Sequence, residues 1–338
     1  MNLILTISVY PALIALAITA VLGFVVIPYL RKLKFGQTIR EDGPTWHNSK
    51  TGTPTMGGIM IAAGFLISLI LSFTYVLLST RPFLVENRTE ITLVIAGVGL
   101  TIGMGLIGFI DDYIKVVKKR NLGLTAKQKT TLQLLVAAAY LSSLALSGIN
   151  TTWLPFIGDV NITSGFGIIF WPIALMFIYG FTNAVNLTDG VDGLASTVTL
   201  VVCCAFMLIS VFLNKLGVNM FASAAAGACL GFLTWNAHPA KVFMGDTGSL
   251  LLGGIVVSLA FSIGRPILLI AAGIMYIVEA FSVILQVAYY KKTKKRLFKM
   301  SPIHHHFEMS GYSEEKIVLL FSIITAVGCF IAALPTII

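Results

Sequence analysis

The 338-residue sequence carries little charge. Only 11% of its residues are Asp, Glu, Lys or Arg, while 57% are hydrophobic and the mean hydropathy is +0.92. Soluble domains carry about 25% charged residues, so this composition excludes a water-soluble globular fold. Backbone groups in lipid must be satisfied within helices or closed barrels. The apolar runs are long and continuous, which favours helices of about 20 residues over barrel strands.

Several signatures of other protein classes are missing. The first ten residues contain neither Lys nor Arg, so the basic region of a cleavable signal peptide is absent and the first apolar run is expected to remain as a span. There is no GxxxxGK phosphate loop. The four cysteines form no CxxC pair and lie within apolar runs, which predicts buried packing rather than a zinc site or a disulfide.

Glycines in one apolar run imitate a nucleotide-binding motif. Gly103, Gly105 and Gly108 match the pattern GxGxxG, but no strand precedes them. The dinucleotide interpretation therefore lacks its structural context. Together with the Gly99 and Gly103 pair, the pattern predicts close packing between helices.

Ten apolar stretches predict the fold class. We expect an all-α polytopic membrane protein, one integral-membrane domain over residues 1–338, with about ten transmembrane helices. The expected spans are residues 5–30, 57–79, 91–110, 130–147, 164–183, 194–213, 219–236, 248–263, 266–289 and 317–338. Residues 148–163 are expected to be a plain connector.

The basic residues predict the orientation of these spans. Of the 23 Lys and Arg residues, 19 fall in loops that follow odd-numbered spans, and four fall on the other side: Arg81, Arg88, Lys215 and Arg265. Cytoplasmic loops carry the excess of basic residues. This pattern predicts a cytoplasmic site and both termini outside, and it explains the net charge of +9 without nucleic-acid binding. Most acidic residues also fall on the cytoplasmic side.

Two polar clusters lie at predicted span ends. Asp111 and Asp112 point about 100° apart on a helix, so they should have different roles; the alternative is a solvated helix end with a weak Asp111–Lys115 pair. The segment from Asn186 to Asp192 places several oxygen ligands beside glycines, which suits Mg²⁺. Its alternative is an Asx-type turn between spans.

Two further clusters follow later in the chain. Asp246 lies where a span begins, and a helix N-terminus favours an anion such as a metal-bridged diphosphate; the alternative is an ordinary N-cap at Asp246 or Thr247. Three consecutive histidines, His304 to His306, follow a basic run that is typical of a membrane-surface anchor. Imidazoles can donate to phosphate oxygens, whereas consecutive histidines rarely bind one zinc ion.

The four motifs IDDYIK, NLTDGVDGLA, FMGDTGSL and PIHHHFE together resemble the polyprenyl-phosphate N-acetylhexosamine-1-phosphate transferase superfamily. The resemblance covers essentially the whole chain. The PIHHHFE form resembles its phospho-N-acetylmuramoyl-pentapeptide-transferase branch, which implies a bacterial inner-membrane enzyme of peptidoglycan synthesis. The implied reaction joins UDP-MurNAc-pentapeptide and undecaprenyl phosphate to give lipid I and UMP, with Mg²⁺.

The resemblance also implies roles for individual residues. It implies a metal ligand at Asp246 and an acidic pair at Asp111 and Asp112, with Asp111 as a candidate base toward the lipid phosphate. The uridine end of the nucleotide is implied to meet Asp192, Asn236, Phe243 and Lys50. Other active-site positions are implied at Lys115, Lys127, Asn186, Asp189, Gly190, His304, His305 and His306.

Alternatives remain open at this stage. A related transferase would use another UDP-amino sugar, and a secondary transporter would place ionisable groups near the bilayer midplane, where Glu279 is expected. Direct attack by the lipid phosphate and an aspartyl-phosphate intermediate both fit, with direct attack favoured because that phosphate is already ionised. The sequence leaves the oligomeric state undecided, a homodimer included.

Overall fold

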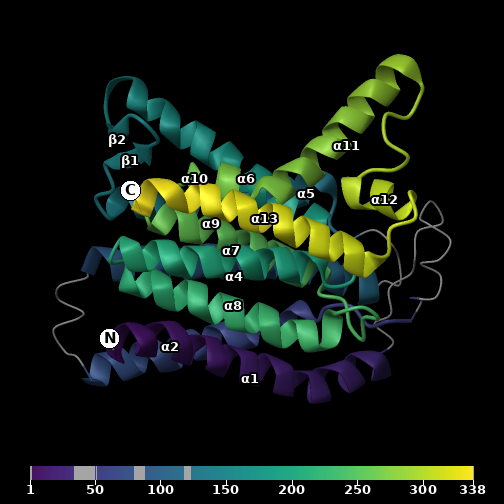
Figure 1. Cartoon of the computed structure of the whole chain (residues 1–338), viewed down its shortest axis with the longest axis horizontal. Helices are drawn as coiled ribbons and strands as arrows, with labels where there is room; N and C mark the ends of the chain where they lie inside the picture. The colour runs from purple at the N-terminus through teal and green to yellow at the C-terminus, as the bar shows by residue number, and fades with distance from the viewer. Residues whose placement is uncertain (1, 34–49, 51, 80–87, 118–122, 338) are drawn as a thin grey trace.

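The computed structural model describes residues 2–33, 50, 52–79, 88–117 and 123–337. Ten helices in these ranges are long and apolar enough to cross a membrane. They are α1 (Asn2–Lys32), α2 (Gly58–Ser79), α4 (Arg88–Val117), α5 (Ala126–Leu146), α6 (Phe170–Thr188), α7 (Leu194–Phe212), α8 (Leu216–Asn236), α9 (Gly245–Ser262), α11 (Ile274–Thr293) and α13 (Glu314–Ile337). Each of the ten predicted spans overlaps one of them, so the all-α polytopic membrane fold is confirmed (Figure 1).

Two predictions need correction. The ninth span does not run unbroken from residue 266, because a short helix α10 (Leu268–Ala272) ends at Gly273 before α11 begins. A Cβ at Gly273 would lie 2.5 Å from the Phe181 ring, so this position permits a close approach to α6. The expected plain connector instead contains an antiparallel hairpin of β1 (Thr151–Leu154) and β2 (Gly158–Asn161), followed by the 3₁₀ helix η2 (Gly165–Ile169).

The core surrounds α9. Every residue of α9 from Thr247 to Ser262 is buried, and its most extensive contacts are with α4, α6 and α2. Because this helix is apolar on all sides, it is stable only when protein encloses it. In contrast, α11 diverges from the bundle and carries exposed apolar side chains, as expected for a lipid-facing helix (Figure 1).

Glycines bring α4 and α9 into close contact. Added Cβ atoms at Gly97, Gly105 and Gly108 would meet Ser258, Leu251 and Asp246 of α9, respectively. The predicted helix-packing role is confirmed for Gly105 and Gly108, and for Gly103, where a Cβ would meet Val136 of α5. Gly99 differs, because it is exposed and a Cβ there would meet nothing within 4 Å.

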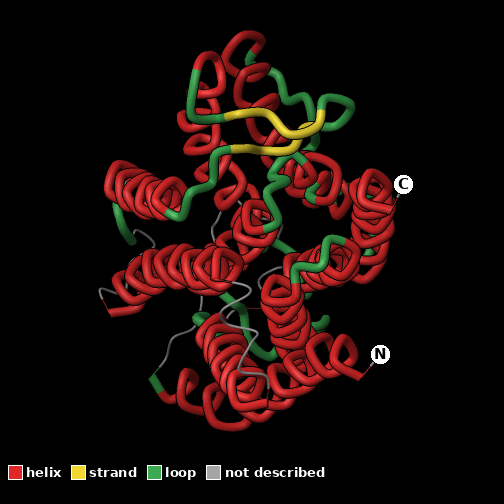
Figure 2. Tube along the Cα trace, turned by 90° about the vertical axis from the view of Figure 1, so that its left-hand side faces the viewer, coloured by secondary structure: helices red, strands yellow, loops and turns green. Residues whose placement is uncertain are grey.

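The two ends of the bundle carry different elements. The hairpin and both chain termini lie at one end, and α12 (Ile303–Glu308) lies at the other (Figure 1). Figure 2 shows the hairpin strands in yellow, outside the helical bundle. The C-terminal ends of α4, α6 and α8 and the N-terminal end of α9 meet at the end opposite the hairpin, which places the polar motifs there together.

Candidate active site

Asp111 and Asp112 occupy the last turns of α4 and point to different partners. Asp111 accepts a hydrogen bond from the Leu124 amide at 2.7 Å and lies 2.5 Å from Lys115 Nζ. One oxygen of Asp112 accepts both the amide (2.9 Å) and the hydroxyl (2.7 Å) of Thr247. Both carboxylates are buried. The predicted divergence of adjacent helical residues is confirmed, and the solvated-helix-end alternative does not apply.

Asp246 lies in the first turn of α9 and joins three helices. Its Oδ2 accepts from Lys115 and Lys129, each at 2.9 Å, and its Oδ1 accepts from Asn186 Nδ2 at 2.8 Å. The N-cap of α9 is Met244, so neither Asp246 nor Thr247 is the N-cap. Asp246 is thus directed into the space between α4, α5 and α6.

The three carboxylates could hold a divalent cation. Asp111, Asp112 and Asp246 each offer an oxygen, and these oxygens lie within 4.8 Å of one another. Mg²⁺ prefers hard oxygen ligands and commonly uses one or two carboxylates together with substrate phosphates. The donor set therefore fits the expected ion. In this structure Lys115 and Lys129 neutralise part of the negative charge.

The two lysines near the start of α5 have different surroundings. A capping box between Thr125 and Gln128 fixes the start of this helix. Lys129 then faces Asp246, whereas Lys127 is exposed and makes no ion pair within the part of the chain that the structure describes. Residues two apart on a helix point about 200° apart. Lys129 is therefore the α5 lysine that contacts the carboxylates, and no contact among the described residues supports the active-site role that the resemblance implies for Lys127.

A second polar cluster surrounds Asp192 in the turn between α6 and α7. Lys50 Nζ lies 2.7 Å from both Asp192 Oδ1 and Glu314 Oε2, and His238 Nδ1 lies 3.1 Å from Asp192 Oδ2. Burial alone would lower the pKa of Lys50, but its hydrogen bonds to Asp192 and Glu314 outweigh that effect and raise the pKa. Asp192, His238 and Glu314 also offer ligand atoms that are close enough to hold a metal ion. The Lys50 ammonium, however, already contacts the carboxylates of Asp192 and Glu314.

Asn236 ends α8, and Phe243 lies in the segment between α8 and α9. Asn236 accepts from the Gly193 amide at 3.2 Å and donates to the Val242 carbonyl at 3.0 Å, so it fixes the turn between α6 and α7 against the end of α8. The Phe243 carbonyl accepts from the Gly57 amide at 2.8 Å, which ties the segment before α9 to the start of α2.

Asp189 lies between the two clusters. Burial raises its pKa to about 8, with further contributions from the carboxylates of Asp246, Asp112 and Asp192. Its neighbour Gly190 packs against His304, because a Cβ there would lie 2.2 Å from His304 Nε2. The four polar motifs therefore form one connected region at one end of the bundle.

The three histidines have different surroundings. His304 is buried, and its Nδ1 lies 3.1 Å from Glu279 Oε1. His305 Nδ1 lies 2.5 Å from Glu308 Oε2, and His306 Nδ1 accepts the Lys299 amide at 3.2 Å. Each imidazole thus has a partner of its own, a carboxylate for His304 and His305 and a backbone amide for His306.

Sequence reasoning overlooked several polar contacts at this end of the bundle. These involve Lys129, Thr247, His238, Glu314 and the pairing of Glu279. For Thr247, His238 and Glu314 the available signal was a polar residue next to a predicted span end. For Glu279 it was a carboxylate within an apolar run.

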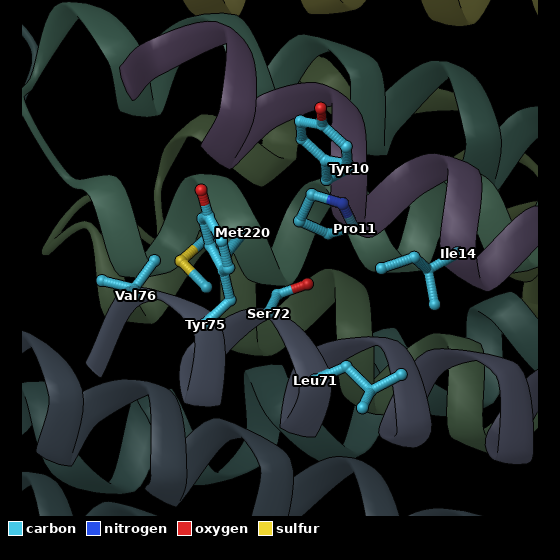
Figure 3. Close-up of a pocket in the computed structure, with 8 residues that line it drawn as sticks. All are labelled: Tyr10, Pro11, Ile14, Leu71, Ser72, Tyr75, Val76 and Met220. Atoms are coloured by element: carbon cyan, nitrogen blue, oxygen red, sulfur yellow. The ribbon is translucent and has the colours of Figure 1, made fainter. Parts of the chain in front are cut away.

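A hollow distant from the carboxylates lies between α1, α2 and α8. Its lining includes Tyr10, Ser72, Tyr75 and Met220, and the buried Ser72 hydroxyl has no hydrogen-bond partner among the described atoms (Figure 3). Most of its lining is apolar and it holds no carboxylate, lysine or histidine. The polar end of the bundle therefore remains the candidate active site.

Comparisons with known proteins agree with this geometry. Residues 92–264 match the family model described as glycosyl transferase family 4. A phospho-N-acetylmuramoyl-pentapeptide-transferase of Clostridium perfringens (strain 13 / Type A) is 46% identical over 321 residues, which cover 94% of this chain and 95% of the relative. Proteins of the same name from Halalkalibacterium halodurans (46% identical, 91% of each chain) and Acetivibrio thermocellus (45% identical, 96% and 93%) also match. The chain therefore belongs to glycosyl transferase family 4 and to the phospho-N-acetylmuramoyl-pentapeptide-transferases.

Proposed function

We propose that this protein transfers phospho-MurNAc-pentapeptide from UDP-MurNAc-pentapeptide to undecaprenyl phosphate, giving lipid I and UMP. The observation that carries the proposal is the meeting of Asp111, Asp112 and Asp246 at one end of a ten-span bundle, in a chain 46% identical to a relative bearing that enzyme name. An acceptor anchored in the bilayer and a soluble donor can meet only at the membrane surface. A polar site at the helix ends satisfies both requirements.

The chemical obstacle is repulsion between two anions. A phosphate oxygen of the lipid attacks the phosphorus attached to the sugar, and the bond from that phosphorus to the bridging oxygen breaks as UMP leaves. Catalysis of phosphoryl transfer depends mainly on positioning and charge stabilisation. Lys115 and Lys129, which contact Asp246, supply positive charge beside the reacting groups.

Mg²⁺ is part of the proposal, with Asp246 as a ligand and Asp111 and Asp112 close enough to contribute. Bound there, the ion would supply neutralising charge for the diphosphate. One oxygen of Asp112 accepts both hydrogen bonds from Thr247, whereas Asp111 accepts one from the Leu124 amide and pairs with Lys115. Asp111 is therefore better placed than Asp112 to act toward the lipid phosphate.

The second cluster is proposed to bind the uridine nucleotide. Lys50 pairs with Asp192, Asn236 accepts the amide of the neighbouring Gly193, and Phe243 lies in the segment just before Asp246. Lys50 is a cation that can exchange its carboxylate partners for a nucleotide group. We also propose that this end faces the cytoplasm of a bacterial inner membrane, because the basic run 291–299 lies there.

The test uses the purified full-length protein in detergent with undecaprenyl phosphate. Release of UMP and formation of a lipid-linked product from UDP-MurNAc-pentapeptide, abolished by EDTA and restored by Mg²⁺, is the expected result. Turnover only with UDP-GlcNAc would assign the protein to a related sugar-phosphate transferase. Absence of turnover with either donor would contradict the proposal.

A further inference from the structure

Glu279 is a carboxylate enclosed within α11. Its side chain is completely buried, Oε1 lies 3.1 Å from His304 Nδ1, and Oε2 has no hydrogen-bond partner among the described atoms. Removing a carboxylate from water costs several kcal/mol even after the protein relaxes. A glutamate at this place is therefore poor for stability alone, which points to a role in fixing His304.

His304 lies between Glu279 and the turn that joins α6 to α7. With Nδ1 engaged by Glu279, the other ring nitrogen faces the backbone of Gly190, where an added Cβ would lie only 2.2 Å away. His304 itself is 1% exposed, so the ring has little freedom to turn. The imidazole thus serves as a rigid support under Gly190.

The supported turn carries the groups that face the two polar clusters. Asp189 directly precedes Gly190 and lies near the carboxylates of Asp246 and Asp112. Asp192 follows in the same turn and contacts Lys50 and His238. A shift of the Gly190 backbone would therefore displace residues proposed to bind the donor.

We infer that Glu279 is a positioning residue, which acts through His304 to hold the Asp189–Asp192 turn in the geometry that binds the uridine nucleotide. The inference rests on the proposed function and assigns to His304 a supporting role distinct from those of His305 and His306. It also predicts that the acceptor lipid phosphate, which is expected at the carboxylate cluster, is bound without help from Glu279.

The first test compares Glu279→Ala and Glu279→Gln in the full-length protein. A misplacement of about 1 Å can cost on the order of 100-fold in rate, so E279A should weaken UMP binding at least about tenfold and lower kcat about 100-fold. The KM for undecaprenyl phosphate should stay within about twofold. E279Q keeps an oxygen that accepts from His304 and should recover most of the loss.

Glu90 provides a matched control for general destabilisation. It is a buried carboxylate in α4 near the opposite end of the bundle, where it accepts the amides of Gly217 (2.6 Å) and Val218 (3.1 Å). Glu90→Gln should lower the melting temperature yet leave UMP affinity within about twofold. Equal losses of UMP affinity in E90Q and E279A, or wild-type affinity in E279A, would overturn the inference.

A double-mutant cycle tests the contact between His304 and Gly190. Gly190→Ala introduces a methyl group against the ring, and we expect about a 100-fold loss of transfer rate. In the His304→Ala background the same substitution should cost less than about threefold, because its obstacle is gone. Equal penalties in both backgrounds would refute the support role. A wild-type protein that neither binds UMP nor transfers would instead refute the proposed function.

Discussion

Gly108 is the position at which a single methyl group should separate the carboxylates. It lies one turn before Asp111 and Asp112 on α4, directly against the first turn of α9. An added Cβ would lie 2.0 Å from the Asp246 carbonyl oxygen and 2.7 Å from the Thr247 amide nitrogen. Both obstacles are backbone atoms, so no side chain can rotate away to make room.

The size of the effect follows from this gap. Ordinary contact begins at 3.4 Å, so the Gly108→Ala methyl is about 1.4 Å too close to the Asp246 carbonyl. Overpacking of this kind costs about 1–3 kcal/mol, and a shift of about 1 Å in a catalytic arrangement costs on the order of 100-fold in rate. Separating the helices also pulls Thr247 away from Asp112, to which it donates twice.

The assay measures lipid I formation and thermal unfolding for Gly108→Ala beside Gly99→Ala. Gly99 lies on the same helix but is exposed, with nothing within 4 Å of an added Cβ. We expect a roughly 100-fold loss of rate and a lower melting temperature for G108A, and wild-type behaviour for G99A. A G108A enzyme within threefold of the wild-type rate would refute the reasoning.

Three other predictions concern the polar clusters. Asp246→Asn should abolish transfer and any Mg²⁺-dependent rise in melting temperature, and a retained Mg²⁺ response would remove Asp246 as a ligand. Lys129→Ala should lower the transfer rate at least about tenfold whereas Lys127→Ala should not, because, of these two α5 lysines, Lys129 is the one that contacts Asp246; equal rates would contradict this. The pKa of Asp189 is raised from 3.8 to about 8, so the proton on this carboxyl stabilises the folded state. That contribution is complete below about pH 4, decreases as the pH rises, and is lost once the pH has passed about 8. In melting measurements without metal, the stability of Asp189→Asn relative to the wild type should increase between about pH 4 and 8 and stay constant at higher pH. A stability difference that does not change with pH would contradict the raised pKa of Asp189.

Much of the fold follows from composition and hydropathy. The ten spans were predictable because each apolar run is long enough to cross a bilayer and is bounded by polar residues. Placement of the motifs at one end followed from counting spans: Asp111 follows the third predicted span and Asp192 the fifth, and two odd-numbered spans end on the same side. The break at Gly273 was not predictable, because it depends on the approach of Phe181 from another helix.

Side-chain pairing in the site required the structure. Lys127 and Lys129 are chemically identical in the sequence, and only the rotation of α5 against α9 decides which one reaches Asp246. The pairs Lys50–Glu314 and Glu279–His304 join segments separated along the chain, for which no local pattern gives a distance. Local periodicity determines which face of a helix is apolar, but the partner of each polar residue depends on packing.

The hairpin of β1 and β2 offers a way to label one side of this enzyme without touching its chemistry. Its turn residue Phe156 is fully exposed, and the hairpin lies at the end of the bundle opposite α12 (Figure 1). Exposed loop tips tolerate inserted sequence, so a protease site placed there should leave catalysis intact. Cleavage by protease added to intact spheroplasts would then report that the carboxylates face the cell interior, whereas cleavage only in inverted vesicles would reverse that orientation.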